Sequence, residues 1–83
     1  MRRRTKRRIR PTELDQIQSL MLKTRTTDRE LARKNGMEAN MPKFRQILDG
    51  KRVEDDMRIR SIINYLIGKM IETDLHNKNI KLK

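Results

Sequence analysis

The sequence predicts an all-α protein, a small bundle of four to five helices behind a flexible basic N-terminal arm. Three observations support this fold class. The chain has 83 residues, 34% apolar and 40% charged, which is enough for one thin core and no second domain. Apolar residues recur at helical spacing between residues 14 and 71. Capping residues and glycines divide that stretch into segments of helical length.

Positive charge is concentrated at the N-terminus. The chain has 22 Lys and Arg against 11 acidic residues, a net charge of +11 that favours a polyanionic partner. Like-charge repulsion predicts a disordered arm over residues 1–10, where seven cations stand with no helical or strand period. We interpret it as a nucleic-acid arm that contacts phosphates or enters a minor groove; a solubilising tail is the alternative. Its cations are Arg2, Arg3, Arg4, Lys6, Arg7, Arg8 and Arg10.

A first helix is predicted to start around Pro11 and Thr12 and to run to about Lys23 or Thr24. Thr12 is a suitable N-cap, and Glu13 lies in the first turn, where the helix dipole favours an acid. Apolar residues then recur on one face, at Leu14, Ile17, Leu20 and Met21.

The second helix has a clear signal at each end. Thr27 and Glu30 have the spacing of a capping box, in which the Thr27 hydroxyl and the Glu30 carboxylate each accept a backbone N–H of the other residue. Gly36 can adopt the left-handed conformation that ends helices. These signals predict a helix over residues 28–34.

Two further helices follow. The third is expected between Asn40, a good N-cap, and Gly50, with Pro42 in its first turn. The fourth is the longest and begins at the three carboxylates of residues 54–56. Its apolar residues cover more than one face, which indicates a central core helix or a self-association surface. The folded domain is therefore expected over residues 11–76, followed by a basic, polar tail over 77–83.

The second and third helices carry a spaced set of small and apolar residues. Ala32 precedes Gly36 by four positions, and Phe44, Ile47 and Gly50 follow at intervals of three. This pattern resembles the phage-repressor family of helix-turn-helix proteins, the Cro and lambda-repressor type, over residues 14–71. In that family the small residue lets the two helices approach, and the apolar pair holds the second one on the core. The turn is about two residues longer here, which leaves open which third-helix residues face a ligand.

The resemblance implies a sequence-specific regulator that binds double-stranded DNA, a repressor of phage or plasmid type. The family reads bases from the start and exposed face of its second motif helix. In the major groove, Asn or Gln pairs with adenine, and Arg or Lys with guanine. The corresponding residues are Asn40, Met41, Lys43, Arg45 and Gln46, of which Asn40 is equally well explained as an N-cap. Phosphate contacts are expected from Thr27, Arg29, Lys51 and Arg52.

Other partners and activities are judged from what the chain contains. We expect a homodimer formed through the long apolar C-terminal helix, and no cofactor, metal or small-molecule substrate. Cysteine is lacking, and His76, the one histidine, lies in the polar C-terminal part, so no enzyme is expected. Apolar runs are far shorter than a membrane span, which favours a cytoplasmic, nucleoid-associated protein. The alternatives are an RNA-binding or protein-masking factor that uses the arginine-rich arm, or an accessory DNA architectural protein.

Overall fold

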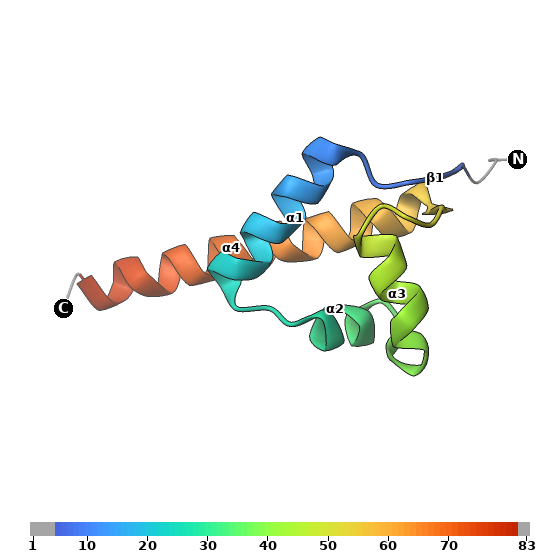
Figure 1. Ribbon diagram of the computed structural model, residues 1–83. Helices are drawn as coiled ribbons and strands as arrows, with labels where there is room; N and C mark the ends of the chain where they lie inside the picture. The colour runs from blue at the N-terminus through green and yellow to red at the C-terminus, as the bar shows by residue number, and fades with distance from the viewer. Residues whose placement is uncertain (1–4, 82–83) are drawn as a thin grey trace, which may run out of the picture.

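Four α-helices make up most of the chain, as the sequence predicts (Figure 1). The computed structural model describes residues 5–81, and side chains over residues 5–76. The helices are α1 (Pro11–Thr24), α2 (Asp28–Lys34), α3 (Met41–Leu48) and α4 (Asp56–Lys81). A 3-10 turn, η1 (Glu38–Asn40), precedes α3, and two short strands are β1 (Lys6–Arg7) and β2 (Glu54–Asp55).

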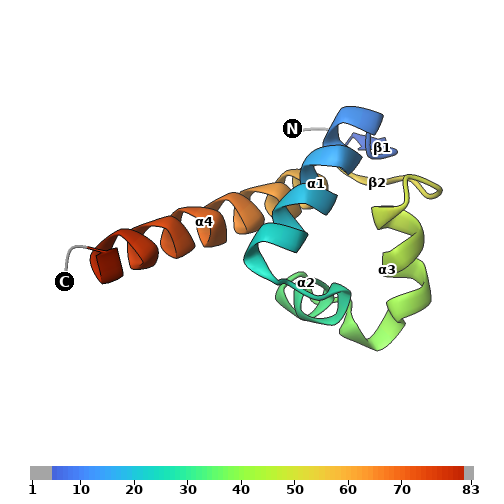
Figure 2. The same cartoon turned by 60° about the vertical axis from the view of Figure 1, so that its left-hand side comes forward.

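The helices enclose one small core on the N-terminal half of α4. Figures 1 and 2 show α1 crossing this half of α4, with α2 and α3 beside it, while the C-terminal half of α4 projects beyond the body. Phe44, the largest fully buried side chain, belongs to this core and has no exposed surface. The remaining core residues are Ile9, Ile17, Leu31, Ala32, Met37, Ile47, Leu48, Ile59, Ile62 and Leu66.

The boundaries of α2 match those predicted. The Thr27 hydroxyl accepts the Glu30 N–H at 3.1 Å, and Gly36 has a φ of +69° just beyond the helix. The other half of the predicted capping box differs, because the Glu30 carboxylate is used elsewhere. It accepts hydrogen bonds from the Tyr65 hydroxyl, at 2.7 Å, and from Lys69 Nζ, both on α4. Glu30 therefore joins α2 to α4.

The first helix begins two residues earlier than the predicted N-cap, Thr12, would place it. Arg10, with extended backbone (ψ 154°), is the N-cap in place of Thr12, and Pro11 is the first helical residue. The Glu13 carboxylate accepts the Arg10 N–H at 2.9 Å. Proline suits this first position because its missing N–H has no partner there in any case.

The N-terminal segment does not follow the expectation of a disordered arm over residues 1–10. Strand β1 pairs antiparallel with β2, with Lys6 opposite Asp55 and Arg7 opposite Glu54. Ile9 enters the core and is 3% exposed. Repulsion within the basic run is offset because Arg7 pairs with acidic residues of the body. Residues 1–4 lie outside the described residues.

The last helix also differs at both ends from the prediction. Glu54 and Asp55 form β2 ahead of the helix, so α4 begins at Asp56. The backbone then continues as helix to Lys81, through most of the predicted polar tail.

Candidate nucleic-acid interface

The outer face of α3 is polar and exposed. Phe44, Ile47 and Leu48 turn inward to the core, which fixes how the helix is rotated on the body. Helical spacing then places the opposite side chains in solvent. The exposed residues are Pro42, Arg45, Gln46 and Asp49.

Arg45 and Gln46 each have a polar neighbour that restrains them. Arg45 Nε lies 3.6 Å from Asp28 Oδ2, and the two side chains are 60% and 46% exposed. Exposed pairs of this kind contribute at most about 1 kcal/mol, so the guanidinium is free to exchange this partner for another. Gln46 Oε1 accepts a hydrogen bond from Arg52 Nη1 at 3.3 Å. Both groups are thus held loosely, pointing outward.

The predicted base-reading residues at the start of α3 differ in how accessible they are. Asn40 is the exposed N-cap residue, but its side chain makes no capping hydrogen bond in the described part of the chain. The side-chain cap predicted for Asn40 is therefore not formed within the described residues. Met41 packs against the core, and Lys43 is half-buried. These last two predicted base-reading residues are less accessible than Arg45 and Gln46.

The long turn before α3 is ordered by backbone bonds. The Met37 N–H donates to the Ala32 carbonyl at 2.8 Å, and the Gly36 N–H donates to the Arg33 carbonyl at 3.2 Å. These two hydrogen bonds form a Schellman motif. Met37 is buried, and the extra residues form η1. The apolar residue directly after Gly36 was the sequence signal for this motif, which the prediction did not use.

The predicted phosphate-binding residues lie at the start of α2 and in the loop after α3. The Arg29 side chain is 79% exposed, and its Nε lies 3.4 Å from Glu38 Oε2. Lys51 and Arg52 are exposed in the loop between α3 and β2. Thr27 uses its hydroxyl as the cap of α2, so a contact from Thr27 would compete with that role.

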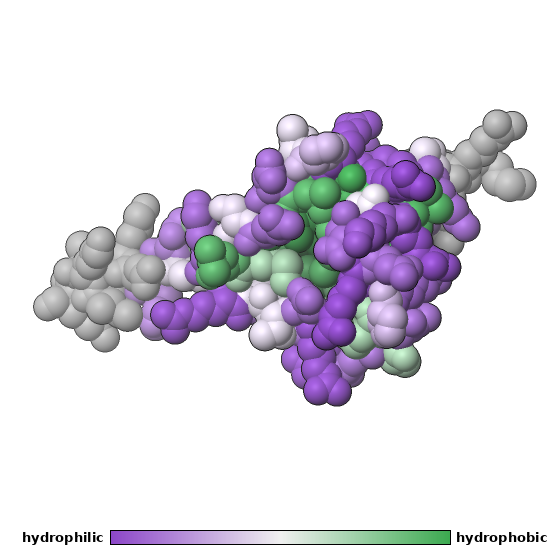
Figure 3. Space-filling view, in the orientation of Figure 1, coloured by the Kyte–Doolittle hydropathy of each residue, from purple (hydrophilic) through white to green (hydrophobic). Residues whose placement is uncertain are grey.

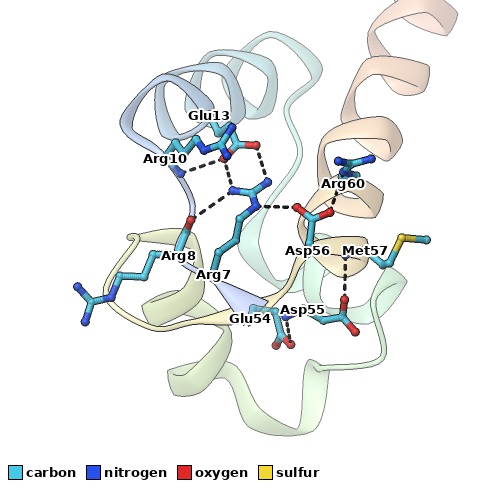
Figure 4. A network of polar contacts seen from close by, with 9 residues as sticks. All are labelled: Arg7, Arg8, Arg10, Glu13, Glu54, Asp55, Asp56, Met57 and Arg60. Carbon is cyan, nitrogen blue, oxygen red and sulfur yellow. Dashed lines mark hydrogen bonds and ion pairs between the residues drawn. The ribbon is translucent and has the colours of Figure 1, made fainter. Parts of the chain in front are cut away.

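Arg7 is fully engaged within the protein. Its Nη1 and Nη2 donate to the two carboxylate oxygens of Glu13 at 2.6 and 2.9 Å, and its Nε donates to Asp56 Oδ1 at 2.6 Å (Figure 4). These hydrogen bonds lower the pKa of Glu13 to about 2 and also lower the pKa of Asp56. Arg7 therefore positions the N-terminal segment instead of offering a charge to a ligand.

The cations that neighbour Arg7 in the sequence remain accessible to a ligand. Lys6, Arg8 and Arg10 are exposed, and Figure 4 shows the Arg8 side chain pointing away from the Arg7 cluster. Arg2, Arg3 and Arg4 lie outside the described residues.

The segment around Ile9 lies against the loop that follows α3. A Cβ added at Gly50 would meet the Ile9 carbonyl oxygen at 3.3 Å, so the two backbones are in contact there. Exposed cations adjoin this contact in both segments of the chain. We call them the basic edge: Arg8, Arg10, Lys51 and Arg52. The sequence did not predict this juxtaposition, which brings residues about forty positions apart together at the C-terminal end of α3.

Comparison of the chain with protein-family models, curated proteins and solved structures found no match. Within the described residues, no three His, Asp or Glu side chains are grouped to hold a metal ion. The helices of the described part are also too short or too polar to cross a membrane.

Proposed function

We propose that the protein is a sequence-specific regulator that binds double-stranded DNA, with α3 in the major groove. The observation that carries the proposal is the orientation of α3. Its apolar side is fixed in the core, while Arg45 and Gln46 face outward beside the basic edge. Base-edge contacts supply specificity and phosphate contacts supply position, and this surface offers side chains of both kinds.

The two outward residues have the chemistry for direct readout. A Gln amide pairs with adenine through two hydrogen bonds, and an Arg guanidinium pairs likewise with guanine. Their present partners, Arg52 and Asp28, hold the two side chains only weakly, so each can be exchanged for a base edge. Asn40, exposed at the start of α3, is a third candidate. Asp49 on the same face would repel phosphate, so the DNA backbone would lie to either side of α3.

The basic edge and Arg29 would then contact phosphates on either side of α3, with Arg2, Arg3 and Arg4 adding charge. Regulation would follow from occupancy, because a bound protein blocks polymerase or another factor, as in a repressor of phage or plasmid type. Such a protein acts at the nucleoid.

Selection from a random pool of duplex DNA tests this proposal. At about 150 mM salt, long-range charge attraction is screened, so recovered sequences report base contacts. Arg45→Ala and Gln46→Ala should each lower discrimination at one base pair by ~1–3 kcal/mol. Arg33→Ala removes an exposed α2 cation away from this face and should leave discrimination unchanged.

A pool that yields no motif would contradict the proposal. Tight, salt-sensitive binding without a motif would favour an architectural DNA protein. Selection of a structured RNA would favour an RNA-binding factor.

A further inference from the structure

The projecting half of α4 carries an exposed apolar stripe. Ile67, Ile71 and Leu75 are 37%, 54% and 56% exposed. They are spaced four residues apart, so they lie on one face of the helix. Figures 1 and 2 show this half of α4 extending beyond the other helices, and Figure 3 shows apolar surface continuing along it. Surface of this kind, on a small and highly charged protein, indicates a partner.

The backbone beside the stripe is open to close approach. Gly68 adjoins Ile67 and Ile71 on this face, and a Cβ added there would meet no atom within 4 Å. A second helix can therefore lie close to α4 at this point, with its apolar side chains against the glycine.

Charge indicates what the partner is. Residues 61–81, the part of α4 that would pair, hold Lys69, Lys78 and Lys81 against Glu72 and Asp74, a net charge of only +1 in a chain of +11. Lys69 is moreover paired with Glu30. A nucleic acid would be drawn to the basic edge instead. A second copy of this positively charged chain meets the least repulsion at this stripe.

We propose that a second copy of the chain binds this stripe, with the two α4 helices packed antiparallel across Ile71. Antiparallel packing places the two basic bodies at opposite ends of the helix pair. A parallel arrangement would bring them side by side and add repulsion between their cations. In the antiparallel pair, Ile67 of one copy lies opposite Leu75 of the other, and Ile71 packs against its own counterpart.

This geometry has a consequence for DNA recognition that rests on the proposed function. Ile62, in the core, precedes Ile71 by nine residues, or ~14 Å of helix, so the two bodies would be offset by ~27 Å along the helix pair. Half-sites one turn of DNA apart are separated by ~34 Å. The dimer therefore suits a site with two-fold symmetry.

Sedimentation equilibrium of the full chain without DNA, over a series of protein concentrations, tests the dimer. The mass should rise from 10.0 kDa to twice that value. Ile71→Glu should weaken association by roughly tenfold or more, because two unpaired carboxylates would be buried at the two-fold axis. Leu22→Glu makes the same change at a residue of α1 that is 81% exposed and should leave association unchanged.

Circular dichroism should show both variants folded, since each changes an exposed side chain. A wild-type chain that is monomeric throughout would overturn the proposal, as would an Ile71→Glu variant that associates as the wild type does.

Cysteine crosslinking tests the orientation, because the natural chain has no cysteine. Mixed Ile67→Cys and Leu75→Cys chains should crosslink to each other, whereas Leu75→Cys alone should not. Efficient crosslinking of Leu75→Cys to itself would overturn the antiparallel arrangement. A dimer that selects no DNA motif would contradict the proposed function alone, and a monomer that selects one would contradict the dimer alone.

Discussion

Arg7 forms a bidentate ion pair with Glu13, in which its Nη1 and Nη2 lie 2.6 and 2.9 Å from the two carboxylate oxygens. The same carboxylate caps α1 by accepting the Arg10 N–H. Through its third donor, Arg7 also holds Asp56, which pairs in turn with Arg60 at 2.9 Å. One arginine of the basic run thus fixes the N-terminal segment to the first turns of α1 and α4. The exposed arginines on either side of Ile9 are held in place by this cluster.

Acid should weaken the fold through Glu13. Its pKa lies at about 2 in the folded protein, below its ordinary value of 4.5, because the charged form is hydrogen-bonded to Arg7. The resulting stability is fully present above pH 4.5 and is lost as the pH falls toward 2. It amounts to ~2–3 kcal/mol of the free energy of unfolding.

Urea unfolding at a series of pH values measures this contribution. Glu13→Gln should lower stability at pH 7 and flatten the acid dependence, while Asp15→Asn, an exposed change on the same helix, should do neither. An acid dependence unchanged in Glu13→Gln would refute the role assigned to this pair.

Gly50 should tolerate a side chain less well than Gly36. Both are left-handed, with φ of +73° and +69°, so alanine at either costs ~1–2 kcal/mol of backbone energy. An alanine Cβ at Gly50 would also lie 3.2 Å from Leu14 Cδ1 and 3.3 Å from the Ile9 carbonyl oxygen, whereas Gly36 has open space. Gly50→Ala should therefore lower the free energy of unfolding further than Gly36→Ala. Equal losses in urea unfolding would mean that Leu14 and the Ile9 segment do not pack closely against Gly50.

How much of this fold the sequence predicts depends on how local each signal is. The bounds of α2 follow from Thr27 and Gly36, which act within one turn of the helix they limit. The buried side of α3 follows from Phe44 and Ile47 at helical spacing. The docking of Arg7 could not be predicted in this way, because its partner Asp56 is 49 positions away and the surrounding arginines indicate repulsion.

The candidate site also divides into residues that local signals predict and contacts that they do not. Arg45 and Gln46 were predicted as exposed residues of α3, since the helical period alone places Gln46 opposite Phe44 and Arg45 opposite Ile47. The basic edge was not, because it depends on the contact between Gly50 and the Ile9 backbone. Glu30 shows the same limit. Its sequence spacing correctly predicted that its backbone N–H is capped, but not that its carboxylate binds α4.

Phe44→Ala should unfold or nearly unfold the domain. Phe44 has no exposed surface, and truncating a buried phenylalanine costs ~3–5 kcal/mol, a large share of the stability of so small a core. Val53→Ala, at a residue that is 50% exposed, should change stability by less than about 0.5 kcal/mol. Thermal unfolding followed by circular dichroism compares the two. A cooperative transition near the wild-type temperature for Phe44→Ala would contradict the assignment of α3 to the core.

The basic edge should account for part of the salt dependence of DNA binding. Deleting residues 2–10 would also remove Ile9 and Arg7, which hold the fold, so point substitutions are the sharper test. Arg8→Gln with Arg10→Gln removes two exposed cations and keeps the backbone that caps α1. If both contact phosphates, the slope of log K against log salt should become less steep by about 1.8.

The double variant Arg33→Gln with Lys34→Gln is the matched control, since it removes the same charge from α2. It should leave the slope nearly unchanged, and both variants should unfold as the wild type does. Fluorescence anisotropy of a labelled duplex across a salt series gives the slopes. Equal slopes for the two double variants would show that the N-terminal arginines attract DNA only through net charge, without contacting it.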